Sequence, residues 1–189
     1  MIGWEAKGPR LITASFKTSQ KKIKMNLILG YAPTNASSDE TKNEFYEQLE
    51  AILDSLNDKD VNILLGDFNA KVGQQNNGYE ECMGKHGLGM MNENGELFAN
   101  TCALYNFVIG GTVFPHKEIH KGTWVSPDHK TINQIDHICI SKKFRRSLLD
   151  VKVRSDSSAV VETDAIESKP FSSGRSRSQH HGASSGRTS

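Results

Sequence analysis

The chain has 189 residues, of which 36% are hydrophobic and 24% charged, and its formal net charge is +1. This size fits one globular domain with a full core, and no apolar run approaches the ~20 residues that a membrane span requires. The first residues lack the basic start and apolar centre of a secretory signal. Three cysteines (Cys82, Cys102 and Cys139) form no CxxC pair, which predicts reduced, packed thiols in an intracellular protein.

The charge is unevenly distributed. The last 18 residues, 172–189, contain three arginines and no acid, which leaves a net charge of −2 for residues 1–171. The body therefore lacks the basic excess of a protein that holds nucleic acid by charge alone, although a metal-dependent phosphodiesterase tolerates such a balance because its site needs carboxylates. Residues 172–189 are mostly Ser, Arg and Gly, which predicts disorder because they cannot bury enough apolar surface.

The first half of the chain predicts a strand–helix–strand unit. Strands are expected at residues 11–17 and 25–31, and Pro33 ends the second of them. Residues 39–56 have helical spacing, since the apolar side chains fall on one face, and an apolar run at 61–65 predicts the next strand. This order suggests a βαβ-type or related layered unit.

The second half predicts shorter elements. A helix is expected at residues 93–105, after a long Gly-, Asn- and Gln-rich surface loop that begins at residue 71. Short strands are expected at residues 107–109, 122–125, 134–140 and 150–153.

The strand at 61–65 is followed by Gly66, Asp67, Phe68 and Asn69. If the chain stays extended there, Asp67 and Asn69 point the same way, at the edge of the sheet where α/β proteins bind ligands. An Asx-rich turn that closes the strand is the alternative, because Gly, Asp and Asn are ordinary turn residues.

Two further segments carry polar groups that suit phosphate chemistry. Tyr31 ends a strand and can aim its hydroxyl at a phosphate, although packing is the alternative. Asp136 stands between apolar neighbours, where an unpaired charge is costly, so a capping or salt-bridge role is the alternative for this acid.

Together these segments resemble the endonuclease/exonuclease/phosphatase superfamily, and in particular the apurinic-type endonuclease domain of RTE-like non-LTR retrotransposons. The resemblance is carried, in family order, by Gly3–Glu5, Tyr31–Thr34, Gly66–Gly73, Met91–Gly95, Thr123–Trp124 and Ile135–Ile138. It implies an α/β fold, a four-layer sandwich of two facing mixed sheets flanked by helices. It also implies cleavage of DNA phosphodiesters with Mg²⁺ (or Mn²⁺) and a nuclear location.

The resemblance also implies a role for each matched residue. Asp67 would orient or deprotonate the attacking water and is a possible metal ligand, and Asn69 would hold that water or the phosphate. Asp136 would pair with a catalytic histidine and favour its charged form. Tyr31 would contact the scissile phosphate, and the cleft would be lined by Thr123 and Trp124.

The chain departs from the family pattern at both ends. Family domains begin with a strand bearing an Asn, then a helix, then a metal-binding Glu, and nothing before Gly3 matches that segment; Glu5 belongs to the matched Gly-Trp-Glu element. The family's final Ser-Asp-His is replaced by Ser155, Asp156 and Ser157. We therefore predict a partial domain at residues 1–154, incomplete at its N- and C-terminal strands, then a divergent segment at 155–171 and the tail at 172–189.

Loss of the terminal acid–base group alone is expected to lower the rate by ~10²–10⁴-fold. The sequence thus predicts a domain of nuclease ancestry that is impaired or inactive by itself. One alternative is a non-catalytic remnant that acts as a nuclear binding or scaffold protein, and a weaker one is a phosphatase of small phosphoesters. DNA is the expected partner, and the sequence indicates neither a membrane nor a protein partner.

Overall fold

The computed structural model describes residues 1–153. The sequence motif at Ser155–Ser157 and the predicted segments at 155–171 and 172–189 lie outside this range.

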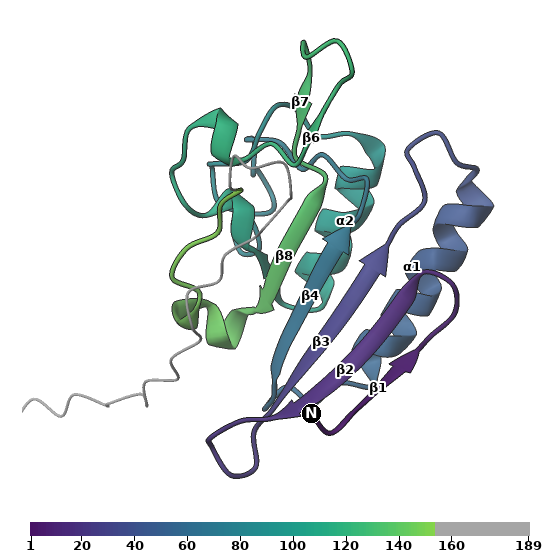
Figure 1. Ribbon diagram of the computed structural model, residues 1–189, viewed down its shortest axis with the longest axis vertical. Coiled ribbons are helices and arrows are strands. Elements are labelled where there is room, and N and C mark those ends of the chain that lie inside the picture. Colours follow the sequence, from purple (N-terminus) through teal and green to yellow (C-terminus); the bar gives the residue numbers. More distant parts are fainter. Residues whose placement is uncertain (154–189) are drawn as a thin grey trace, which may run out of the picture.

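A six-stranded mixed sheet forms the body of the protein (Figure 1). The only parallel pair among its strands joins β3 and β4 through helix α1 (Asp39–Asp54), which confirms the predicted βαβ unit. In spatial order the strands are β1 (Gly3–Ala6), β2 (Leu11–Lys17), β3 (Lys24–Tyr31), β4 (Val61–Asp67), β8 (Asp136–Ser141) and β5 (Phe107–Ile109).

The remaining elements are small. Helix α2 (Glu93–Leu104) follows the long loop that the composition predicts, and β6 (Trp124–Val125) pairs with β7 (Ile132–Asn133) in a two-stranded sheet that projects from the body (Figure 1). Three short 3-10 helices complete the structure: η1 (Gly110–Thr112), η2 (Glu118–His120) and η3 (Lys142–Ser147).

Both α-helices begin at side-chain caps. The Ser38 hydroxyl accepts a hydrogen bond from the Thr41 N–H at 3.4 Å, and the Asn92 side chain accepts one from the Gly95 N–H at 2.8 Å. Each cap satisfies an N–H that has no partner inside the helix, which fixes where the helix starts.

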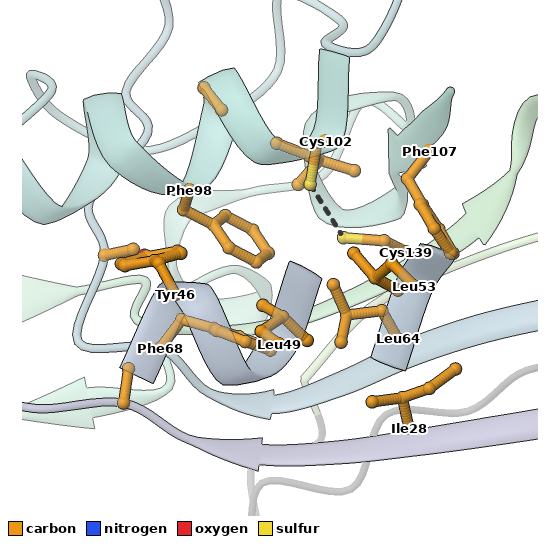
Figure 2. Packing of buried hydrophobic residues seen from close by; sticks show 14 of the residues in the cluster. Ile28, Tyr46, Leu49, Leu53, Leu64, Phe68, Phe98, Cys102, Phe107 and Cys139 are labelled. Atoms are coloured by element: carbon orange, nitrogen blue, oxygen red, sulfur yellow. Dashed lines mark hydrogen bonds between the residues drawn. The ribbon is translucent and has the colours of Figure 1, made fainter. Parts of the chain in front are cut away.

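The main core lies between the helices and one face of the sheet (Figure 2). Phe68 stacks on Phe98 of α2 with ring centroids 4.3 Å apart, and Leu49 of α1 is fully buried beside them. Cys102 and Cys139 meet in this core with their Sγ atoms 3.9 Å apart, and all three cysteines are free and buried, as the sequence predicts.

The opposite face of the sheet is only half covered. Over β4 and β8 it packs against a second apolar cluster that includes Leu148 and Val151 from the end of the described chain. Met25 and Leu27 of β3 also pack against this cluster. The other side chains that point to this side of β1, β2 and β3 are Trp4, Ala6, Ile12, Ala14, Phe16, Leu29 and Tyr31.

The α/β class is confirmed, with one large mixed sheet and a second sheet that has two strands within residues 1–153. The predicted strand at 150–153 is wrong. This segment is irregular because its hydrogen bonds are local or reach a 3-10 helix: the Val151 N–H donates to Asp150 Oδ1 and the Val153 N–H to the His120 carbonyl. None of the helices within residues 1–153 combines the length and the hydrophobicity that a membrane span requires.

Candidate functional site

Three of the predicted site residues lie side by side at one edge of the sheet. Tyr31 at the end of β3 pairs directly with Asp67 at the end of β4, and Asp67 pairs with Asp136 at the start of β8. Directly paired residues point to the same face of a sheet. The register therefore brings a phenol and two carboxylates onto neighbouring strands, on the side of the sheet that the helices leave free.

Gly66 makes this arrangement possible. It has φ +140°, and a Cβ atom at this position would lie 1.9 Å from the Gly30 carbonyl oxygen of β3. Only glycine allows such a backbone conformation and so close an approach. The glycine before Asp67 is thus required for the strand pairing that positions the carboxylate.

The chain turns immediately after Asp67. Asn69 has φ +47°, its N–H donates to Asp67 Oδ1 at 2.9 Å, and its Nδ2 donates to the Ala32 carbonyl at 3.0 Å. The chain therefore does not stay extended through Asp67 and Asn69, as the prediction of side chains pointing the same way required, because Asn69 is in a left-handed conformation. The alternative prediction, an Asx turn that closes the strand, describes this segment. The turn nevertheless holds both side chains at the same edge.

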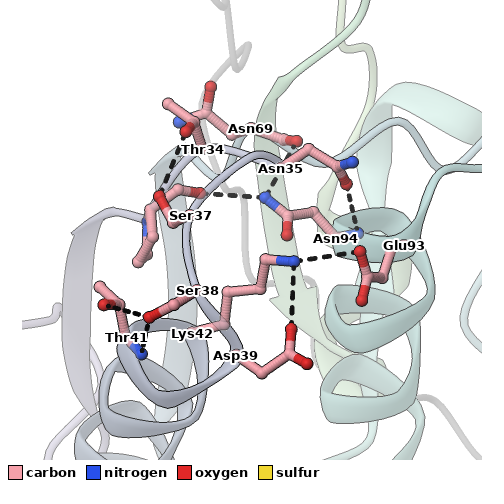
Figure 3. A network of polar contacts seen from close by, with 11 residues as sticks. Thr34, Asn35, Ser37, Ser38, Asp39, Thr41, Lys42, Asn69, Glu93 and Asn94 are labelled. Atoms are coloured by element: carbon pink, nitrogen blue, oxygen red, sulfur yellow. Dashed lines mark hydrogen bonds and ion pairs between the residues drawn. The ribbon is translucent and has the colours of Figure 1, made fainter.

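A buried asparagine ties this edge together (Figure 3). Asn94, near the start of α2, donates from Nδ2 to the Pro33 carbonyl at 2.9 Å and the Asn69 carbonyl at 3.3 Å. Its N–H donates to Asn35 Oδ1 at 3.1 Å. Sequence reasoning missed this role, although the Asn-rich run before Gly95 was a signal for it.

The last wall of the site comes from Thr123 and Asp136. The Thr123 Oγ1 accepts hydrogen bonds from the N–H groups of Ile135 and Asp136 at 3.0 and 3.1 Å. Burial raises the pKa of the Asp136 carboxyl; the Thr123 hydroxyl opposes this shift, and the nearby Asp67 adds to it. Within residues 1–153, Asp136 makes no ion pair, so the salt-bridge alternative finds no partner there.

The predicted residues do not all share one hollow. Thr123 and Asp136 line a small hollow together with Gln134, whereas Tyr31, Asp67 and Asn69 do not line it. Trp124 lies on β6, in the projecting two-stranded sheet, and is 42% exposed. The site is therefore an open edge with one small recess.

His137 lies on the other face of the sheet. Its ring is buried, stacks on Phe98 at 5.0 Å and has Nε2 2.7 Å from the Ala70 carbonyl. Burial lowers the pKa of His137 to about 4, against the opposing effect of the Ala70 carbonyl. This histidine is a neutral core residue and does not face Asp136's side of the sheet.

The buried His137 makes stability depend on pH. The ordinary pKa of 6.5 applies in the unfolded chain, so the unfolded state takes up the proton first as the pH falls. The stabilisation that neutral His137 gives the folded state is complete above pH 6.5 and is lost as the pH falls toward 4. Between pH 7 and pH 5 we expect this residue to lower the free energy of unfolding by about 2 kcal/mol.

Urea unfolding at several pH values checks this expectation. His137→Asn should lose this part of the pH dependence, whatever its effect on stability at pH 7. His129→Asn is the matched control, because His129 is exposed and asparagine tolerates its φ of +56°. If the free energy of unfolding depended on pH equally in the two variants, His137 would not be the source of this pH dependence.

No protein-family model matches the chain. It is 34% identical to Craniofacial development protein 2 of Bos taurus over 154 residues, which are 82% of this chain and 25% of the relative. The chain thus spans about a quarter of the length of the curated relatives it matches.

Solved structures share the fold. The endonuclease domain of TRAS1, a telomere-specific non-LTR retrotransposon, matches with a TM-score of 0.53 at 14% identity, over 80% of this chain and 58% of that one. The 3′ phosphatase NExo from Neisseria, bound to product DNA hairpin, matches with a TM-score of 0.54 at 19% identity, over 82% of this chain and 65% of that one.

Over 154 residues the chain is similar to Craniofacial development protein 2, and it shares its fold with the TRAS1 endonuclease domain and NExo. These similarities agree with the resemblance inferred from the sequence motifs. At these identities the structural likeness establishes the fold, and the roles of the individual residues stay predictions.

The carboxylates at this edge of the sheet offer a limited set of metal ligands. No group of three or more His, Cys, Asp or Glu residues in the described range is placed to hold a metal ion. Asp67 and Asp136 are adjacent, however, and Mg²⁺ is commonly held by one or two carboxylates with water and substrate phosphate completing its shell. The pair fits such a partial set.

Proposed function

We propose that this chain is a DNA-phosphate-binding domain of the magnesium-dependent nuclease type, whose hydrolytic activity is impaired. The observation that carries the proposal is the register that sets Tyr31, Asp67 and Asp136 on neighbouring strands of an open edge. The neighbours of this fold include an endonuclease domain and a phosphatase bound to DNA, which supports a nucleic-acid phosphate as the ligand.

Each residue of the edge would act on the phosphate or on water. Asp67 has one carboxylate oxygen engaged by the Asn69 N–H, so its other oxygen is available to accept a hydrogen bond from an attacking water. Tyr31 is 53% exposed, and its hydroxyl would donate to a phosphate oxygen. Mg²⁺ or Mn²⁺ held by Asp67 and Asp136 would offset the negative charge that develops on the phosphate.

The activity is expected to be low because no histidine within residues 1–153 hydrogen-bonds the Asp136 carboxylate. His137 is buried on the other side of the sheet, and His120, which lines the same small hollow as Asp136, has its Nδ1 3.4 Å from the Val153 carbonyl instead. General acid–base catalysis typically contributes about 10²–10⁴-fold, so its loss leaves only positioning and charge stabilisation.

Nicking of supercoiled plasmid in the presence of Mg²⁺ tests the proposal. We expect a rate at least about 10²-fold below that of the TRAS1 endonuclease domain, with any residual nicking lost in Asp67→Asn. Asp58→Asn is the matched control, because Asp58 is an exposed carboxylate outside the site. Robust nicking that Asp67→Asn abolishes would show that the chain is a competent enzyme and would refute the proposed impairment.

A non-catalytic role as a nuclear binding or scaffold protein is the second candidate. It is favoured by the lack of a group of three metal-binding residues within residues 1–153. DNA binding that Tyr31→Phe and Asp67→Asn leave unchanged, without nicking, would support it. A phosphatase of small phosphoesters is a weaker candidate, and Mg²⁺-dependent phosphate release from soluble monoesters without nicking would favour it.

A further inference from the structure

The end of the sheet opposite the candidate site gathers positive charge. The loop that joins β2 to β3 lies there, and β8 ends there and continues into η3 (Figure 1). Residues 17–24 and 142–146 contain eight cationic side chains and no acid, although residues 1–153 as a whole carry 18 cations and 18 acids. These eight side chains, which we call the basic edge, are Lys17, Lys21, Lys22, Lys24, Lys142, Lys143, Arg145 and Arg146.

Hydrogen bonds and strand register place both segments in one row. Lys17 pairs directly with Lys24 at the end of the β2–β3 ladder, and the Lys24 N–H donates to Asp60 Oδ1 at 2.8 Å, beside the start of β4. The Asn62 N–H of β4 donates to Ser141 Oγ at 3.3 Å, and Ser141 is the last residue of β8 before η3. Neighbouring strands lie about 4.8 Å apart, so the row from β2 across β3 and β4 to β8 is roughly 15 Å long.

Most of these cations have no counter-ion. Within residues 1–153, Lys142 is the only one of the eight that forms an ion pair, and its partner is Glu81. Two carboxylates precede β4 at this end: Asp60 is buried and accepts the Lys24 N–H, and Asp58 is exposed. The excess of positive charge is therefore not balanced locally, and such a potential attracts anionic ligands.

The backbone does not account for the lysines of the β2–β3 loop. Lys22 has φ +81°, a conformation that favours glycine or asparagine over a lysine. Lys17 and Lys24 carry like charges on directly paired positions, an arrangement that destabilises a sheet. Both features cost stability in the folded chain, and an anion bound between these side chains would offset the repulsion.

We propose that the basic edge binds the phosphate backbone of a nucleic acid, at a surface separate from the candidate site. Strand β4 (Val61–Asp67) spans the distance between the two ends of the sheet, which is roughly 20 Å for seven residues. A DNA duplex carries one negative charge per about 1.7 Å of its axis, so a row of roughly 15 Å faces several phosphates at once. Lysine and arginine contacts to phosphate carry no sequence information, and this binding is therefore independent of sequence.

The apolar side chains of the two segments argue against a lipid surface as the partner. Basic segments that lie on a membrane bury exposed apolar side chains in it. Here the two apolar residues, Ile23 and Phe144, pack against the second apolar cluster of the protein itself. Arg145 is half-buried, with its guanidinium carbon 5.0 Å from the centre of the Phe114 ring, so it contributes charge more than direct contact. The exposed remainder of the basic edge is a row of charges alone, as a nucleic-acid backbone requires.

Fluorescence anisotropy of a short labelled DNA duplex with the full 189-residue chain tests the proposal. The measurement is made in EDTA, so it depends neither on a metal at the candidate site nor on the proposed hydrolysis. We expect Lys22→Asn/Lys143→Gln, which removes one cation from each segment, to weaken binding about tenfold at low ionic strength. The slope of log K against log salt should fall by about 2, since each lost phosphate contact contributes about 0.9.

Lys85→Gln/Lys117→Gln is the matched control, because it removes the same charge from two exposed lysines outside the basic edge. We expect its affinity and its salt dependence to match those of the unaltered chain. Asparagine suits the backbone at position 22 and Lys143 is exposed, so the test variant should fold, and circular dichroism checks this.

Four outcomes would overturn the proposal. The first is a chain that does not bind the duplex in EDTA, and the second is an equal loss of affinity in the control variant. The third is binding that Lys22→Asn/Lys143→Gln leaves intact and Arg175→Gln/Arg177→Gln abolishes, which would assign it to residues 172–189. The fourth is binding to vesicles of phosphatidylserine and phosphatidylcholine, without duplex binding, that the basic-edge variant abolishes; the partner would then be a membrane.

Discussion

Gly66→Ala is expected to lower the free energy of unfolding by about 3 kcal/mol or more and to disorder the candidate site. The new Cβ would lie 1.9 Å from the Gly30 carbonyl oxygen, in a backbone conformation with φ +140°. Strained backbone conformations of this kind cost about 1–3 kcal/mol each, and the steric clash adds to that cost. Because Gly30 belongs to β3, relief of the clash must separate β3 from β4, where Tyr31 pairs with Asp67.

Chemical denaturation and the tyrosine signals of an NMR spectrum check this result. Gly3→Ala is the matched control, since Gly3 also lies in a strand but has open space where its Cβ would stand. We expect the control to change stability by no more than about 0.5 kcal/mol. A Gly66→Ala variant as stable as Gly3→Ala would mean that the strand pairing at the site is not as described.

Phe98→Ala is expected to cost about 3–5 kcal/mol of stability. Phe98 is fully buried and lies between two partners, with its ring 4.3 Å from Phe68 and 5.0 Å from His137. Its removal leaves a cavity between α2 and the sheet, directly behind the turn that carries Asp67 and Asn69. A loss of stability and a loosening of that turn should therefore appear together.

Leu104→Ala on the same helix is the matched control. Leu104 ends α2 and is 66% exposed, so its truncation should change the free energy of unfolding by no more than about 0.5 kcal/mol. Urea unfolding measures both variants. Similar losses in the two would contradict the packing described for the core.

Much of the fold is predictable from local pattern. The spacing of apolar residues locates both helices, and apolar runs locate β3 and β4, since these elements are buried against the core along one face or both. Their order predicts the parallel βαβ unit. In these elements the pattern of apolar residues shows which side chains are buried in the folded protein.

Elements without such a pattern are not predictable in this way. All four residues of strand β1 are exposed, so no periodicity marks it, and it forms because its backbone pairs with β2. Conversely, the β-branched residues Val151 and Val153 suggest a strand, but Val151 packs its side chain into the second apolar cluster and pairs with no strand within residues 1–153. Strand propensity largely reflects packing context, and here the context differs.

The candidate site was predictable in its members and not in its detail. The ends of β3 and β4 must meet at one edge if the two strands are parallel, which places Tyr31 beside Asp67. The left-handed conformation of Asn69 depends on hydrogen bonds to Asp67 and Ala32 that no local pattern contains. The link made by Asn94 joins segments far apart in the chain and is visible only in the folded protein.

The connectivity of the sheet has a consequence for the order of folding. Strands β2, β3 and β4 follow one another in the chain, with α1 between the last two. Strand β8 pairs with β4 although α2 and several short elements separate the two strands in sequence. Closing that long loop costs entropy before any contact repays it, so the docking of β8 is expected as a late step. Asp136 then reaches Asp67 only when the sheet is complete, and a chain arrested before this step would have most of its secondary structure while its two carboxylates remained apart.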